Sequence, residues 1–193
     1  MRPIAVAITG AIGAGKSTAL TAFKRHGAAT VSSDEIVHHL LATDDDVKRA
    51  LVERLGEGVL GEDGRPDRAR IAEIVFRDDK ALAFLEGLLH PLVAREYLTW
   101  REQLGRLPTP PAVCVTEVPL LYEVGGESRF DKVVVITASP EVRIARRIGP
   151  LRERELRLLS EEEKVNRADF VYVNDGTLAE LDRFVSGVVA TLS

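Results

Sequence analysis

The sequence is poor in the features that mark secreted, membrane-spanning and nucleic-acid-binding proteins. Its 193 residues include one cysteine, Cys114, which excludes an internal disulfide framework and favours a reducing compartment. Cys114 lies in an apolar run, where a buried and unreactive thiol is favoured over a nucleophile. No apolar stretch is long enough to span a bilayer, and a formal net charge of -4 argues against a general nucleic-acid binder. The first expected strand begins at the amino terminus, so we expect no signal peptide and a cytoplasmic protein.

The chain length and composition fit one globular domain. With 193 residues, 45% of them hydrophobic and 29% charged, the sequence can bury one substantial core. Short apolar runs predict strands, and helical patterns separate them, which is typical of an α/β protein with a parallel sheet. The strands are expected at Ile4–Ile8, Ala28–Val31, Ala112–Thr116, Lys132–Thr137 and Ala168–Val173.

The first expected strand runs into a glycine-rich stretch, GAIGAGKST at residues 10–18, and a helical pattern follows. A glycine, four residues and then Gly-Lys-Ser, placed between a strand and a helix, form a Walker A P-loop. The glycines allow left-handed backbone angles, so that successive N–H groups curl around a phosphate at the start of a helix. The residues expected to bind nucleotide phosphate are Ala11, Ile12, Gly13, Ala14, Gly15, Lys16, Ser17 and Thr18.

Two side chains of the P-loop carry the expected chemistry. Lys16 can reach the β- and γ-phosphates of ATP, and Ser17 can offer its hydroxyl to Mg²⁺. ATP and Mg²⁺ are therefore the expected cofactors. A glycine-rich turn that only joins a strand to a helix is the alternative, and the complete strand–loop–helix context argues against it.

Asp34 follows the second expected strand and has two interpretations. Ser32 and Glu35 are spaced as a capping box, so this stretch could simply begin a helix. Asp34 would also stand at the carboxyl edge of a parallel sheet, where ligands bind in open α/β folds. In that position it would face the γ-phosphate across from the P-loop.

Two further candidates lie later in the chain. His90 precedes a proline inside the expected helix Asp79–Gly105, which should be interrupted there, and the spacing favours an imidazole bonded to a freed carbonyl over a functional one. Glu117 ends the third strand, where P-loop enzymes place a carboxylate near the water shell of magnesium or near the acceptor. An exposed acid at a strand end is the alternative. Glu123 is expected to be a solvated helix residue.

Arginines are dense after the fourth expected strand. Such a run usually lines a solvated helix face, but a break at residues 148–150 predicts a lid whose guanidinium groups close over triphosphate oxygens. Arg146 is the first candidate for a nucleotide contact and Arg154 the second. The arginines of this run are Arg143, Arg146, Arg147, Arg152, Arg154 and Arg157.

These residues make the chain resemble the dephospho-CoA kinase family over nearly its whole length. The P-loop alone does not choose among kinases, whereas the blocks between Leu55 and Val93 and the segment Val118–Glu123 are more specific. Beside the P-loop and Asp34, the motifs are Leu55-Gly56, Asp63-Gly64, Asp67-Arg68, Val75-Phe76, His90-Pro91-Leu92-Val93, Val118-Pro119-Leu120-Leu121-Tyr122-Glu123, Glu162-Glu163-Lys164, Ala168-Asp169-Phe170-Val171 and Asn174-Asp175-Gly176.

The resemblance implies ATP-dependent phosphorylation of the ribose 3′-hydroxyl of dephospho-coenzyme A, which gives coenzyme A and ADP in the last step of CoA biosynthesis. It implies a three-layer P-loop fold with a five-stranded parallel sheet in the order 2-3-1-4-5. A single kinase domain is expected, with its core at residues 1–34, 106–142 and 165–193. The helical acceptor-binding lobe is expected at about 35–105 and a short lid at about 143–164.

The resemblance also implies roles for individual residues. Asp34 matches the catalytic carboxylate of the family, and Arg146 and Arg154 match lid arginines that bind nucleotide. His90 lies in a motif that makes a structural or acceptor-side role plausible. The residues implied are Asp34, Lys16 and Arg146 for catalysis, Asp34, His90 and Glu117 for the acceptor, and Ser17 for the metal.

The chain departs from the family pattern at a few positions. The family often has aspartate where Ser32 and Glu117 stand and glycine where Ala11 stands, and the lid is shorter than the resemblance leads us to expect. A kinase for a nucleoside monophosphate or another small acceptor shares every P-loop feature and is the alternative. A regulatory GTP-binding protein fits less well, because the sequence has no Asn-Lys-x-Asp run to read guanine. Small-molecule substrates and a monomer or weak homo-oligomer are expected.

Overall fold

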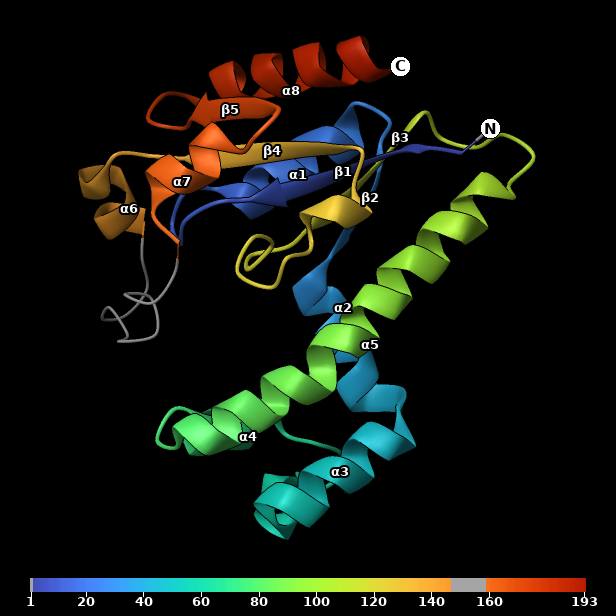
Figure 1. Cartoon of the computed structure of the whole chain (residues 1–193), viewed down its shortest axis with the longest axis vertical. Coiled ribbons are helices and arrows are strands. Elements are labelled where there is room, and N and C mark those ends of the chain that lie inside the picture. The colour runs from blue at the N-terminus through green and yellow to red at the C-terminus, as the bar shows by residue number, and fades with distance from the viewer. Residues whose placement is uncertain (1, 147–158) are drawn as a thin grey trace. The chain divides into compact units, whose positions relative to one another are not determined.

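The computed structural model describes residues 2–146 and 159–193 of the chain (Figure 1). The chain divides into two compact units. The first consists of residues 1–33 and 100–193, and the second of residues 34–99.

The first unit is built on one parallel sheet with the strand order β2-β3-β1-β4-β5. This confirms the predicted fold class and strand order, and each observed strand lies within two residues of its predicted bounds. Its strands are β1 (Ile4–Thr9), β2 (Ala29–Ser32), β3 (Val113–Glu117), β4 (Lys132–Thr137) and β5 (Phe170–Val173). Its described helices are α1 (Lys16–Arg25), α6 (Pro140–Arg146), α7 (Glu161–Asn166) and α8 (Leu178–Leu192), with a 3₁₀ turn at Glu127–Arg129.

The two faces of the sheet are buried by different segments because side chains alternate along each strand. On one face, Val6, Ile8 and Val134 pack with residues of α1 and α8. On the other face, Ala7 and neighbouring residues of β4 pack with the segment after β3 and with α7. Figure 1 shows α8 lying along one side of this sheet. The result is the three-layer arrangement expected of a P-loop fold.

The strand order fixes where a ligand can bind in the first unit. β1 lies at the centre and pairs with β3 on one side and β4 on the other. The chain leaves β1 at its carboxyl end, between these two neighbours, which is the switch point where open α/β sheets bind ligands. The P-loop occupies this position because it directly follows β1.

The second unit is helical. It contains α2 (Ser33–Thr43), α3 (Asp45–Leu55), α4 (Arg68–Val75), a 3₁₀ turn at Glu57–Val59 and most of α5 (Asp79–Gly105). An aspartate caps α3 and another caps α4. Asp44 accepts from the N–H groups of Asp46 and Val47, and Asp67 accepts from those of Ala69 and Arg70. The caps satisfy helix-start donors that otherwise have no partner.

The long helix α5 differs from its prediction. It continues without interruption through Pro91, where a break was expected. A proline removes one N–H donor from a helix and crowds the preceding turn, which costs about 3 kcal/mol. Leu89 and Val93, which stand on either side of Pro91, are both buried, and their packing offsets that cost. None of the described helices is long and apolar enough to cross a membrane.

Candidate phosphate-binding site

The P-loop joins β1 to α1 in the first unit. α1 begins at Lys16, and Gly15 is its N-cap residue in the left-handed conformation, with φ 94° and ψ 27°. No side chain caps the start of α1, and its first turn, which the structure describes in full, carries no acidic residue. The N–H groups of this helix start therefore remain available to an anion, and the helix dipole favours negative charge there.

Three glycines of the P-loop are required by both conformation and space. Gly10, Gly13 and Gly15 all have positive φ, at 138°, 79° and 94°. A Cβ at Gly10 would lie 1.9 Å from the carbonyl oxygen of Ile136, and one at Gly13 would lie 2.8 Å from that of Arg143. Backbone atoms cannot move aside as a flexible side chain can, so the motif is fixed by packing as well as by phosphate chemistry.

The two chemically important side chains of the P-loop face different partners. Lys16 is buried, and its Nζ donates to the carbonyl oxygen of Ala11 at 3.0 Å, so its ammonium group lies over the loop. Ser17 is exposed, and its Oγ donates to Oε1 of Glu117 at 3.4 Å. In a P-loop, the ammonium group at the first position binds β- and γ-phosphate oxygens, and the hydroxyl at the second binds a divalent metal.

Glu117 ends β3 and is buried, with 8% of its surface exposed. This excludes the alternative that Glu117 is an exposed acid at a strand end. In the sheet it lies in register with Ile8 of β1 and Ser32 of β2. The Ser33 hydroxyl donates to the Glu117 carbonyl oxygen at 2.8 Å and fixes this strand end. The structure thus brings together Ser17 and Glu117, two of the predicted site residues.

The donor set at this position suits a hard cation. A serine hydroxyl and a carboxylate are oxygen ligands, which Mg²⁺ prefers, and Mg²⁺ is usually held by one or two protein oxygens with phosphate and water. Among the described residues no cluster of three or more His, Cys, Asp or Glu side chains could hold a metal by itself. The residues present therefore fit a magnesium ion that arrives with a nucleotide.

Asn174 contacts the P-loop, although the sequence singles it out only as part of a turn and of a family motif. Its Nδ2 donates to the carbonyl oxygen of Ala14 in the P-loop at 2.8 Å. Arg146, the last residue of α6, donates from Nη1 to the carbonyl oxygen of Asn174 at 2.8 Å. The structure thus brings the predicted nucleotide-binding Arg146 to the P-loop through Asn174. One signal could have revealed Asn174, because it is a polar residue directly after a parallel strand.

A second group of side chains ties α6 and α7 to β4. The Thr137 hydroxyl donates to Oε1 of Glu161 at 2.8 Å, and Arg143 lies 3.2 Å from Oε2 of the same carboxylate. Arg143 is thus engaged in a half-buried ion pair with Glu161. Its guanidinium supports the helix that carries Arg146.

Glu123 is largely shielded from solvent in an ion pair, so its prediction as a solvated residue is wrong. Its Oε1 lies 2.7 Å from Nζ of Lys164, and the exposed fractions of the two side chains are 14% and 2%. The Leu159 N–H donates to the same carboxylate at 3.3 Å. Buried charges require such pairing, and the partner lies 41 positions away, beyond the reach of a local pattern.

Other predicted residues lie elsewhere. Asp34 is exposed in the first turn of α2, and His90 is half-buried on α5; both belong to the second unit. Arg154 lies outside the described residues, as does most of the segment expected to form a lid. Burial raises the pKa of the Cys114 thiol to about 11, so this cysteine is an unreactive core residue, as the sequence predicts.

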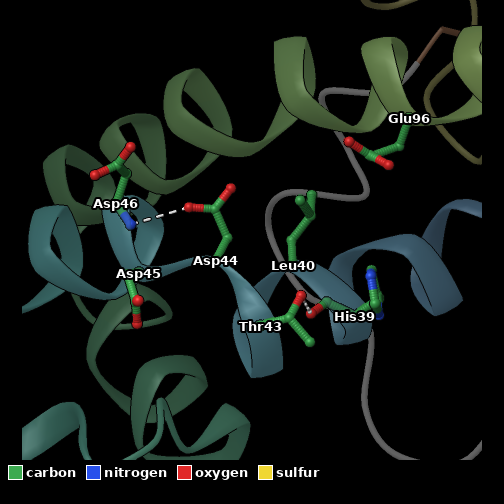
Figure 2. Close-up of a pocket in the computed structure, with 7 residues that line it drawn as sticks. All are labelled: His39, Leu40, Thr43, Asp44, Asp45, Asp46 and Glu96. Atoms are coloured by element: carbon green, nitrogen blue, oxygen red, sulfur yellow. Dashed lines mark hydrogen bonds between the residues drawn. The ribbon is translucent and has the colours of Figure 1, made fainter.

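A separate pocket of about 340 Å³ lies within the second unit (Figure 2). Asp44 uses its carboxylate to cap α3, and the Thr43 hydroxyl donates to the carbonyl oxygen of His39, so part of this lining is engaged in helix structure. The acidic lining disfavours a phosphorylated ligand. The lining residues are His39, Leu40, Thr43, Asp44, Asp45, Asp46 and Glu96.

Comparisons with known proteins agree with the predicted resemblance. The family model described as dephospho-CoA kinase matches residues 4–180. A dephospho-CoA kinase of Protochlamydia amoebophila is 37% identical over 189 residues, which cover 92% of this chain and 91% of that protein.

Two solved structures resemble the whole chain. A crystal structure of a Thermus thermophilus protein matches with a TM-score of 0.77 and 34% identity and covers 100% of both chains. The dephospho-CoA kinase from Campylobacter jejuni matches with a TM-score of 0.71 and 27% identity, over 98% of this chain and 96% of that one. A family model that spans most of the sequence and a relative aligned from end to end leave one assignment: the chain belongs to the dephospho-CoA kinase family.

Proposed function

We propose that this protein transfers the γ-phosphoryl group of ATP to the ribose 3′-hydroxyl of dephospho-CoA and so forms CoA and ADP. The observation that carries the proposal is the family match over residues 4–180, which spans the P-loop, both units and the segment after β3. This match favours dephospho-CoA as the acceptor over another small molecule.

The P-loop supplies the phosphate side of the reaction. Its backbone N–H groups and the uncapped start of α1 bind the phosphate oxygens, and Lys16 neutralises charge on the β- and γ-phosphates. Phosphoryl transfer requires mainly positioning and charge stabilisation, so groups that are already in place contribute most of the rate. Arg146, held beside the P-loop through Asn174, adds a planar guanidinium for the same oxygens.

Ser17 would hold Mg²⁺, with Glu117 acting on the water shell of the ion. The separation of 3.4 Å between their oxygen atoms and the burial of Glu117 support this assignment. A magnesium ion held there would supply positive charge against the phosphate oxygens. The contribution of the chain itself is to fix two oxygen donors at the switch point of the sheet.

The second unit supplies the acceptor side in this proposal. Asp34 accepts the proton of the ribose 3′-hydroxyl while that oxygen forms a bond to the γ-phosphorus, and the electrons of the broken bond leave on the terminal oxygen of ADP. The family resemblance supports Asp34 as this base, and its exposure leaves its carboxylate accessible to an acceptor. His90 is assigned to the same side of the reaction.

An acceptor panel tests the proposed activity. ADP release from ATP and Mg²⁺ is measured by a coupled assay with dephospho-CoA, with several nucleoside monophosphates and without an acceptor. We expect rapid ADP release only when dephospho-CoA is the acceptor. Turnover of a nucleoside monophosphate instead would support the alternative kinase, and tight GTP binding with slow hydrolysis and no acceptor would support a GTP-binding switch.

The remaining expectations concern assembly and location. We expect a monomer or a weak homo-oligomer, which size-exclusion chromatography with light scattering measures at several protein concentrations. A cytoplasmic location stays a prediction from the single cysteine, and labelling in intact cells tests it.

A further inference from the structure

We propose that Asn174 is a positioning residue for the phosphate-binding step. It holds the P-loop peptide between Ala14 and Gly15 in one orientation and docks Arg146 beside that peptide. The proposal deepens the proposed function, because it assumes that a nucleotide phosphate binds in the P-loop.

The side chain of Asn174 contacts the P-loop directly. Its amide group is buried, with 5% of the residue exposed, and Nδ2 donates to the Ala14 carbonyl oxygen at 2.8 Å. A Cβ at Gly15 would lie only 2.3 Å from the same nitrogen. The loop backbone therefore approaches this amide more closely than any residue other than glycine allows.

The backbone of Asn174 is itself tied to the sheet. Its N–H donates to the Thr137 carbonyl oxygen at 2.7 Å, which continues the pairing of β4 with β5 beyond Val173. The neighbouring Asp175 accepts from the N–H of Ser139 at 2.7 Å. The sheet thus holds the backbone of Asn174 in place at the end of β5, and the side chain of Asn174 in turn holds the P-loop.

The geometry of the peptide bond gives this contact its function. The Ala14 carbonyl and the Gly15 N–H belong to one planar trans peptide, so the two groups point in opposite directions. A hydrogen bond that holds the carbonyl toward Asn174 also holds the N–H away from it. We assign that opposite side to the phosphate, because successive N–H groups of such a loop must converge on one anion.

The carbonyl oxygen of Asn174 serves a second purpose. It accepts from Nη1 of Arg146 at 2.8 Å, so one residue connects the P-loop and the arginine expected to contact the nucleotide. Removing the side chain of Asn174 would release the Ala14 carbonyl while leaving its own carbonyl in place. A side-chain substitution therefore tests the loop contact without removing the acceptor of Arg146.

The test is a comparison of Asn174→Asp with Asn166→Asp. Aspartate has the shape of asparagine but offers an oxygen where Nδ2 donates, so two acceptors would face each other at Ala14. Asn166 is exposed at the end of α7, so its substitution adds the same charge away from the loop. We measure the affinity for ADP with Mg²⁺ and for dephospho-CoA by calorimetry, the KM and kcat for ATP, and the thermal midpoint.

We expect Asn174→Asp to weaken ADP binding about tenfold or more, since a buried acceptor loses its donor, and to raise the KM for ATP. Affinity for dephospho-CoA should stay close to that of Asn166→Asp. The thermal midpoint should be lower than that of Asn166→Asp, because Asn174→Asp buries a carboxylate without a donor. Unchanged ADP affinity in Asn174→Asp would overturn the proposal. A lower thermal midpoint without a selective loss of ADP affinity would also overturn it, because Asn174 would then be only structural.

Asn174→Ser is the second variant, in case the aspartate variant does not fold. Its hydroxyl keeps a donor but is too short to restore the full contact, so an intermediate ADP affinity is expected. If neither variant folds, Asn174 supports the fold and not the phosphate site, which also contradicts the proposal. The ADP-binding measurement needs no acceptor. A wild-type protein that binds ADP but does not phosphorylate dephospho-CoA would therefore contradict the proposed function and leave the proposal for Asn174 intact.

Discussion

The two units of the protein bury different kinds of residue. Among the described residues, every buried polar or charged side chain belongs to the first unit. The second unit, residues 34–99, is described throughout and buries only hydrophobic residues. The buried polar residues of the first unit are Thr9, Lys16, Thr116, Glu117, Lys164 and Asn174.

This difference indicates how the work is divided. Burying a polar group costs free energy unless the group is paired. The concentration of buried polar groups around the P-loop therefore indicates that the side chains of the phosphate site are held in place before the ligand binds. The second unit is a packed helical support, and any recognition there must use its exposed or half-buried side chains. Asp34 and His90 are of that kind.

The largest effect is expected where the second unit would contribute to chemistry. Asp34→Asn should reduce kcat about 10²–10⁴-fold, because the variant cannot accept the proton of the acceptor hydroxyl. ADP affinity should be unchanged, since the phosphate site lies in the first unit. Single-turnover kinetics and calorimetry measure both quantities.

The matched control for Asp34 is Asp45→Asn, which makes the same change in the first turn of α3. It should retain the wild-type rate. Near-normal transfer by Asp34→Asn would remove Asp34 from its role and leave the second unit as a support only.

The next effect concerns the charge of the phosphate site. Lys16→Ala should lower kcat/KM for ATP about 10²–10³-fold, the usual range for removing one preorganised donor. Lys24→Ala, an exposed change in the last turn of the same helix, is the control. Equal kinetics in the two variants would show that the P-loop does not bind the reacting phosphates.

A core substitution in the second unit should change the stability of the protein and leave nucleotide binding unchanged. Leu51 is fully buried in its core, so Leu51→Ala should lower the free energy of unfolding by about 2–5 kcal/mol. ADP affinity of the folded variant should be close to that of the wild type. Urea unfolding gives the stability, with the exposed Glu53→Ala on the same helix as the control; a Leu51 variant as stable as this control would contradict the packing.

The smallest effect lies on the last helix of the first unit. The N–H and hydroxyl of Thr177 both donate to Glu180, and these bonds hold the pKa of its carboxyl below the ordinary value of 4.5. The carboxylate therefore adds stability above this value, and that contribution is lost as the pH falls through the lowered pKa.

The Glu180→Gln variant tests this capping contribution. Its thermal midpoint should fall less than that of the wild type between about pH 7 and about pH 3. Glu162→Gln, the same change at an exposed position of α7, serves as the control. Identical pH profiles for the wild type and Glu180→Gln would exclude the contribution.

The features that the sequence predicted correctly are local ones. The P-loop is encoded within a few consecutive residues, because a strand, glycines with positive φ and a helix start follow one another. The parallel sheet followed from short apolar runs, and its strand order came from the family resemblance.

The features that the sequence did not predict depend on distant contacts. Asn174 meets Ala14 across 160 positions, and only the strand order brings the two together. The prediction that Glu123 is solvated was wrong because its partner, Lys164, is distant in the sequence. Lys164 lies on α7, and only the packing of α7 against the sheet brings the two side chains together. Pro91 was predicted to interrupt a helix that neighbouring core residues keep continuous.

The most direct test of the account identifies the product. Purified protein, ATP, Mg²⁺ and dephospho-CoA are combined, and the product is followed by phosphorus NMR and mass spectrometry. The account predicts one new phosphomonoester on the ribose 3′-oxygen, formed in equal amount to ADP and identical to authentic CoA. ADP without this phosphomonoester, or a phosphoryl group at another position, would contradict it.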